Sequence, residues 1–361
     1  MTPGQTLRNL SAKLRVGPDP FNACARLDRM SFHWLNRREL VNFLGTLMAW
    51  PEVAHAQQSE KLSRIGFLPL GSPSNRYDLS YVEAFRSGLV ENGLIEGRNI
   101  TVDLEWVRNE PDYDPTVIEL LRRGARVLVP AGSTASKAAK RQTSTVPIVF
   151  ISVGDPVGIG IVESLAHPGG NATGFTDVLA NLSGKLVQLA SELGIPGTPI
   201  GYLWYEKWPD GRNRFVSTEQ AARTSKVTLE SRTIGDIIEL DSIVAEIKSN
   251  GVRVLIVQPS PFTYRHRDRI IELVTNHGLG MICAWPPAPD EGALIGYGPD
   301  YADIYHRAGS YIVRVLKGEK PADLPVQNPT KFPLVLNLNT AKALGIEVPS
   351  MLLATADKVI E

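Results

Sequence analysis

The chain has 361 residues, a length that allows two domains of about 100–200 residues each. Hydrophobic residues make up 43% and charged residues 21%, which is ordinary for a soluble globular protein. The formal net charge is zero, so there is no electrostatic reason to expect nucleic acid or an anionic membrane as a partner.

The first 56 residues predict a leader. The paired basic residues Arg37 and Arg38 precede a short apolar run, Leu40–Trp50, and the cleavage pattern Ala54–Ala56 follows. The run is too short to span a bilayer. We therefore expect a signal peptide over residues 30–56 that is cut after Ala56, although a buried N-terminal helix is the alternative.

Other features of this leader stay open. The two arginines fit a twin-arginine signal only loosely, so ordinary secretion is an equal alternative. Residues 1–29 have no periodicity and are expected to be either untranslated, with Met30 as the true start, or a disordered extension. No cysteine stands at the cleavage point, so no lipid anchor is expected.

Beyond the leader, strand-like runs alternate with helix-like runs, a pattern typical of parallel sheets built from βαβ units. The segments expected between residues 61 and 176, the first lobe, are strands Ser63–Leu70, Ile100–Trp106, Val127–Pro130 and Pro147–Ile151 with helices Asp78–Asn92, Pro115–Arg123, Ser136–Gln142 and Ile159–Leu165.

A second set of similar length follows and predicts a second lobe over residues 177–290. Its segments are strands Pro199–Tyr205, Lys226–Arg232, Val252–Gln258 and Gly280–Ala284 with helices Leu179–Leu193, Ser217–Ser225, Asp241–Ser249 and Arg267–His277. Residues 291–361, with a helix over Tyr301–Leu316 and a proline-rich extended segment Lys320–Pro333, are expected to be shared between the lobes and the hinge. The fold class predicted is α/β, with two doubly wound parallel-sheet lobes joined by a hinge.

Polar residues that follow the strands of the first lobe are candidate ligand contacts. Ligands of open parallel sheets bind beyond the carboxyl ends of the strands, next to helix N-termini. Ser72, Ser133 and Thr134 could donate hydrogen bonds to a carboxylate, and Asp155 could pair with an amine. Ser72 could instead cap a turn or helix, and Asp155 could cap a helix beginning near Pro156, a role compatible with ligand contact.

The second lobe adds two candidates. Ser260 follows the strand Val252–Gln258, and Trp285 follows Gly280–Ala284 and could stack on an apolar ligand. Filling of the core or hinge is the alternative for this tryptophan.

Several kinds of site lack support in the sequence. Cys24 lies in the leader, so Cys283 has no disulfide partner in the mature chain, and the six histidines show no metal-ligand spacing. The glycine-rich phosphate loops and the nucleophile elbow of common enzymes are missing. We expect no catalytic residue, no metal and no cofactor.

Short motifs spread over the chain after Lys61 resemble those of the ABC-transporter substrate-binding protein family that includes tryptophan- and tyrosine-type binding proteins. The matching residues are Gly66–Leu68, Gly71–Pro73, Phe85–Leu89, Glu96–Asn99, Val146–Phe150, Gly154–Val157, His167–Asn171, Tyr297–Pro299, Leu316–Gln327 and Thr340–Gly345. No single motif is decisive, but their order and spacing together are specific.

The resemblance implies a fold like that of type I periplasmic binding proteins, and it adds Tyr297 to the candidate ligand contacts. It also implies an exported, periplasmic monomer that captures a small ligand, an amino acid or related carboxylate, and delivers it to an ABC permease in the inner membrane. A periplasmic sensor that signals to a membrane receptor is the alternative. The chain departs from the family at Gly296, where family members often have serine, and this leaves the ligand's identity open.

Overall fold

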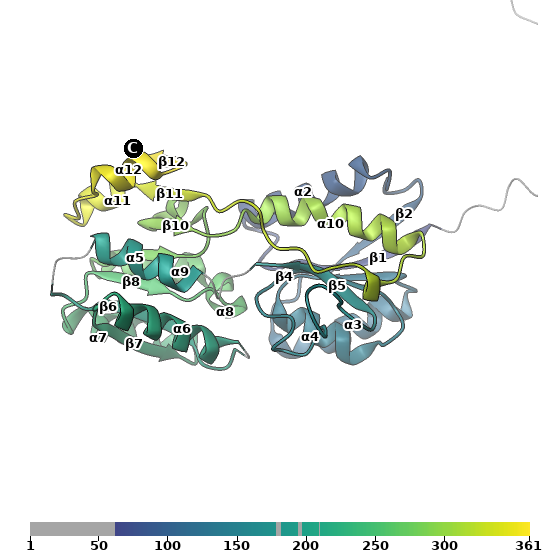
Figure 1. Ribbon diagram of the computed structural model, residues 1–361, viewed down its shortest axis with the longest axis horizontal. Helices are drawn as coiled ribbons and strands as arrows, with labels where there is room; N and C mark the ends of the chain where they lie inside the picture. The colour runs from purple at the N-terminus through teal and green to yellow at the C-terminus, as the bar shows by residue number, and fades with distance from the viewer. Residues whose placement is uncertain (1–61, 178–181, 194–196, 209) are drawn as a thin grey trace, which may run out of the picture. The chain divides into compact units, whose positions relative to one another are not determined.

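The computed structural model describes residues 62–177, 182–193, 197–208 and 210–361. These residues form two α/β lobes, each built on one sheet (Figure 1). The leader expected over residues 1–56, with its cleavage site after Ala56, lies outside the described residues. Within the described part of the chain, no helix is long and apolar enough to cross a membrane.

The first lobe has a five-stranded parallel sheet of order β2-β1-β3-β4-β5. Alternate residues of its strands face opposite sides. Ile65 and Phe67 pack under α2 and α10, whereas Leu68 and Leu128 pack under α3 and α4. The bounds are β1 Ser63–Leu68, β2 Ile100–Leu104, β3 Val127–Pro130, β4 Ile148–Val153, β5 Ala172–Thr176, α2 Arg76–Glu91, α3 Tyr113–Arg122, α4 Ser133–Gln142 and α10 Tyr301–Leu316.

The second lobe has a seven-stranded sheet of order β12-β11-β10-β9-β8-β6-β7, parallel except where β10 meets β11. Helices α5 and α6 pack on one face, and α7 and α9 pack on the other. The bounds are β6 Ile200–Tyr205, β7 Leu229–Ile234, β8 Val254–Val257, β9 Gly280–Cys283, β10 Ile295–Tyr297, β11 Leu334–Asn337, β12 Lys358–Ile360, α5 Ser183–Leu193, α6 Gly211–Thr224, α7 Leu240–Ser249, α8 Pro261–Arg265, α9 Arg267–Asn276, α11 Leu338–Ala343 and α12 Ser350–Thr355. Short 3₁₀ helices are η2 Glu110–Asp112, η4 Ile237–Glu239, η5 Ala288–Glu291 and η6 Pro321–Asp323.

The chain passes between the lobes three times: from β5 to α5, from β10 to α10, and from η6 to β11. The third passage pairs with the edge of the first sheet, because Gln327 N–H donates to Gly174 O (2.9 Å) and Thr176 N–H donates to Gln327 O (2.9 Å). The second passage returns the chain to the first lobe, so α10, from the last fifth of the chain, covers the sheet built by β1 to β5.

Helices α2 and α10 pack against each other through glycine. A Cβ atom on Gly88 would lie 1.9 Å from the carbonyl oxygen of His306, and one on Gly309 would lie 2.3 Å from the carbonyl carbon of Gly88. Only hydrogen fits at both positions, so the two backbones touch.

The predicted fold class is confirmed, with differences in detail. The helix expected over Ile159–Leu165 is wrong, since this segment forms turns. Strands β5, β10, β11 and β12 are absent from the sequence prediction, and α4 begins at Ser133 rather than Ser136.

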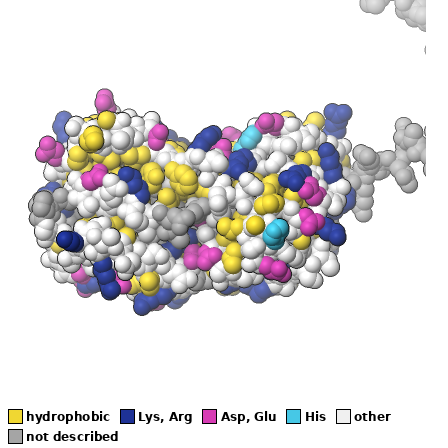
Figure 2. All heavy atoms as spheres, viewed as in Figure 1, with side chains coloured by type: hydrophobic (Ala, Val, Ile, Leu, Met, Phe, Trp, Pro, Cys, Tyr) yellow, Lys and Arg dark blue, Asp and Glu magenta, His cyan; other side chains and the backbone are white. Residues whose placement is uncertain are grey.

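Lysine, arginine and acidic side chains are interspersed on the face shown in Figure 2.

Candidate functional site

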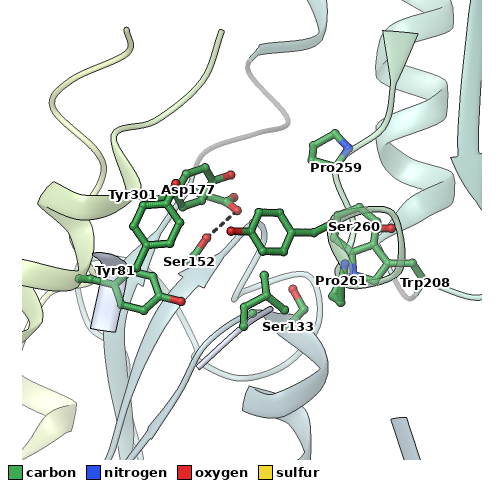
Figure 3. A pocket seen from close by; sticks show the side chains of 14 residues that line it. Tyr81, Ser133, Ser152, Asp177, Trp208, Pro259, Ser260, Pro261 and Tyr301 are labelled. Carbon is green, nitrogen blue, oxygen red and sulfur yellow. Dashed lines mark hydrogen bonds between the residues drawn. The ribbon is translucent and has the colours of Figure 1, made fainter. Parts of the chain in front are cut away.

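A pocket lies between the lobes, at the carboxyl ends of strands from both sheets (Figure 3). About 530 Å³ of space there is not filled by protein atoms, and this volume includes open solvent. Its aromatic walls are formed by Tyr81, Trp208, Tyr264, Tyr301 and Tyr305.

Ser133 lies at the polar end of the pocket, in the first turn of α4. The preceding residue, Gly132, has a φ of 81° and donates its N–H to Ile151 O (2.8 Å), which ties the start of the helix to β4. Glycine suits this left-handed backbone. The Ser133 hydroxyl therefore lines the pocket beside the first-turn N–H groups of a helix, which favour an anion.

Ser152, the last but one residue of β4, has an unusual backbone conformation. Its φ is 57°, and the pairing of β4 with β5 shifts register at this point. A left-handed serine costs about 1–2 kcal/mol, and such strain concentrates at functional sites. The bend directs the hydroxyl to Asp177, where it donates to Oδ2 over 3.1 Å.

Asp177 follows β5 and brings a carboxylate to the pocket, although it is only 5% exposed. Arg214 of α6 places Nη2 3.8 Å from Asp177 Oδ1 and Nε 2.5 Å from Asp210 Oδ2. Burial raises the pKa of Asp210, and the charge of Arg214 acts against that rise. The guanidinium occupies the space beside Gly154 where a Cβ would lie 1.6 Å from Nη2, so this second-lobe cation packs against a first-lobe loop.

The predicted contacts Ser133 and Ser260 both line the pocket. Ser260 also caps α8, accepting a hydrogen bond from Thr263 N–H (3.1 Å). Thr134 lines a neighbouring hollow of about 670 Å³, partly open to solvent, together with Tyr205 and Arg265.

Ser72 and Asp155 lie outside the lining of this pocket. Ser72 donates its N–H to Asp78 Oδ2 (2.7 Å), and its hydroxyl pairs with that of Ser74 (2.8 Å). Asp155 Oδ1 accepts the N–H of Gly158 (2.8 Å), so its carboxylate stabilises the turn that follows β4.

Trp285 lies behind the pocket and is 4% exposed. Its indole N–H donates to the hydroxyl of Tyr81 (3.1 Å). Tyr297, next to Gly296, is half-buried and packs against the core of the second lobe. A Cβ on Gly296 would lie 2.5 Å from Trp285 O, so this backbone leaves no room for the serine that the family resemblance led us to expect here.

Sequence reasoning missed Asp177, Ser152 and the pocket tyrosines. Asp177 could have been found by predicting β5, because it then follows a strand like the other candidates. Tyr301 and Tyr305 stand four residues apart at the start of a predicted helix, a spacing that places both on one face.

Two α/β lobes with a pocket at their strand ends define a bilobal solute-binding protein. The chain belongs to the ABC transporter substrate binding protein family, which it matches over residues 77–360. This is a family of solute-binding proteins.

The chain is also similar to proteins of known name or known structure. The chain is 24% identical over 266 residues to the "Tyrosine-binding protein" of Clostridioides difficile (strain R20291), covering 73% of this chain and 76% of that one. It is 25% identical, with a TM-score of 0.75, to the crystal structure of an ABC domain in complex with L-Trp from Streptococcus pneumonia. A conserved domain protein from Vibrio cholerae is 24% identical with the same TM-score, and each alignment covers 83% of this chain and all of the other.

Proposed function

We propose that this protein is an exported solute-binding protein that captures an aromatic amino acid between its lobes and delivers it to an ABC importer. The observation that carries the proposal is the pocket itself, in which aromatic walls stand beside a carboxylate and a helix N-terminus. An aromatic amino acid needs those three things: apolar surface for its ring, an anion for its ammonium and donors for its carboxylate.

In this proposal Asp177 pairs with the ligand ammonium. Asp177 already accepts a hydrogen bond from Ser152 and lies 3.8 Å from Arg214, so the ligand ammonium would share this carboxylate with those neighbours. The ligand carboxylate accepts from the Ser133 hydroxyl and the N–H groups of the first turn of α4, and the ring packs among the tyrosines. The tryptophan-bound structure and the tyrosine-binding relative support this choice of ligand class.

Delivery requires export and a membrane partner. The leader over residues 30–56 supports secretion to the periplasm, and membership of the family supports an ABC permease as the recipient. The protein acts as a monomer in this scheme, closing on the ligand and docking in its closed form.

The test is a thermal-shift screen against the twenty amino acids followed by calorimetry, since a ligand stabilises the folded form by mass action. We expect L-tryptophan or L-tyrosine to give the largest shift. Failure of every aromatic amino acid to bind would reject the proposed ligand class.

Two matched variants then locate the ammonium site. Charge-assisted hydrogen bonds contribute about 1.5–3 kcal/mol, so Asp177→Asn should weaken binding roughly 10- to 100-fold. Asp155→Asn removes the carboxylate that the sequence favoured, and because that group stabilises a turn instead, affinity should stay within about threefold. The reverse pattern would return the role to Asp155.

A further inference from the structure

We propose that two pocket tyrosines, Tyr264 and Tyr81, are positioned by hydrogen bonds that each cross from one lobe to the other. The aromatic wall of the pocket is therefore complete only while the lobes are closed. Asp78 and Trp285, which do not line the pocket, are the positioning residues.

Tyr264 belongs to α8 of the second lobe, and its partner belongs to the first. Its hydroxyl donates to Asp78 Oδ1 of α2 over 2.5 Å. Arg267 Nη2 donates to the other oxygen, Asp78 Oδ2, over 3.1 Å, and the Arg267 guanidinium lies 4.5 Å from the centre of the Tyr264 ring. One buried carboxylate of the first lobe thus holds both a ring and a cation of the second.

Tyr81 shows the reciprocal arrangement. It belongs to α2 of the first lobe, and its hydroxyl accepts the indole N–H of Trp285, which follows β9 of the second lobe (3.1 Å). Trp285 in turn contacts the edge of the Tyr264 ring, with centroids 5.4 Å apart. Each tyrosine is therefore hydrogen-bonded to a residue of the opposite lobe. The two hydrogen-bonded pairs are in contact through the rings of Trp285 and Tyr264.

Because these hydrogen bonds are buried, their loss should have a large energetic cost. Asp78 is 1% exposed and Arg267 is 4% exposed, and burial raises the pKa of Asp78 against the opposing charge of Arg267. Burial also raises the pKa of both tyrosines, so their hydroxyls keep their protons. Removing one partner of a buried charged group costs more than removing an exposed contact. The crossing hydrogen bonds should consequently shift the balance between open and closed lobes.

Tyr305 offers a matched control. It lines the same pocket, but its hydroxyl pairs with the backbone of Leu70 within the first lobe. Tyr264→Phe and Tyr305→Phe each remove one hydroxyl from the pocket wall, and only the first removes a contact between lobes.

The experiment measures solvent exchange of two indole N–H groups by NMR in the ligand-free protein. Trp285 reports on the crossing contact itself, and Trp208 lines the pocket from a separate loop. Exchange through brief opening detects even a rare open form. We expect Tyr264→Phe to accelerate both indoles about tenfold relative to Tyr305→Phe. Acceleration of Trp285 alone, or of neither, would overturn the proposal, because it would mean local loosening without lobe opening.

A second measurement rests on the proposed function. If L-tryptophan binds, Tyr264→Phe should weaken it about tenfold more than Tyr305→Phe does. The exchange experiment needs no ligand, so failure of the ligand assignment and failure of the crossing contacts are distinguishable.

Discussion

The glycine contact between α2 and α10 makes a quantitative prediction about stability. Replacing Gly88 with alanine places a Cβ 1.9 Å from the carbonyl oxygen of His306, whereas real Cβ contacts essentially never fall below 3.0 Å. The obstacle is backbone, so no side-chain rotation relieves it. The two helices must separate by the difference of 3.0 and 1.9 Å, which is about 1 Å.

Two opposing effects decide the sign. Alanine is favoured over glycine inside a helix by about 1 kcal/mol. A gap of about 1 Å forfeits a quarter to a half of each dispersion contact along the interface, and overpacking typically costs about 1–3 kcal/mol. The dispersion contacts that would weaken are those of the core between these two helices and the first sheet. Because backbone meets backbone, we expect the steric cost to exceed the helix gain and Gly88→Ala to destabilise the protein by up to about 2 kcal/mol, the overpacking cost less the helix gain.

Urea unfolding followed by circular dichroism measures this change. Gly184→Ala is the matched control, since Gly184 lies in α5 and a Cβ there meets no atom within 4 Å. The control should raise the free energy of unfolding by up to about 1 kcal/mol, whereas Gly88→Ala should lower it. Equal or greater stability of Gly88→Ala would refute the reasoning that these backbones are in contact.

Two further predictions concern titratable groups. Burial raises the pKa of Cys283 to about 12, and the thiolate is the reactive form, so iodoacetamide at pH 8 should modify Cys283 only in unfolded protein; peptide mass spectrometry that finds rapid modification of the folded protein would contradict this. Burial, aided by the charge of Arg265, lowers the pKa of His266 below 6.5, so the unfolded chain binds the proton first and stability falls as pH drops below that value. The loss of unfolding free energy between pH 7 and pH 5 should therefore be smaller in His266→Gln, and an equal loss would argue against it.

The sequence predicts the long elements of this fold well because their patterns are local. The amphipathic segment Tyr301–Leu316 is helical over its whole predicted length as α10. The short strands β10 and β12 have three residues each and depend on neighbours in the sheet, so no local pattern marks them. The segment Ile159–Leu165 has helical spacing, but it forms turns, and Ile161 is buried against the first lobe's core.

Prediction of the site depended on the same distinction between local sequence patterns and contacts made only in three dimensions. Ser133 and Ser260 could be located because each follows a recognisable strand. Asp155 and Asp177 both follow strands of one sheet, and only the three-dimensional arrangement shows that the first turns back to its own loop while the second faces the pocket. Asp78 lies 186 positions from its partner Tyr264, and Trp285 lies 204 positions from its partner Tyr81. No local sequence pattern encodes contacts over such separations.

The threefold passage of the chain between the lobes has a consequence for biosynthesis. The covering of one face of the first sheet by α2 and α10 is incomplete until α10 leaves the ribosome, and the second sheet is unfinished until its last strands, β11 and β12, are made. Each lobe therefore completes its core only after part of the other lobe has been synthesised. Both cores are thus completed only late in synthesis, and no continuous segment shorter than β1 to η6 contains the whole core beneath α2 and α10.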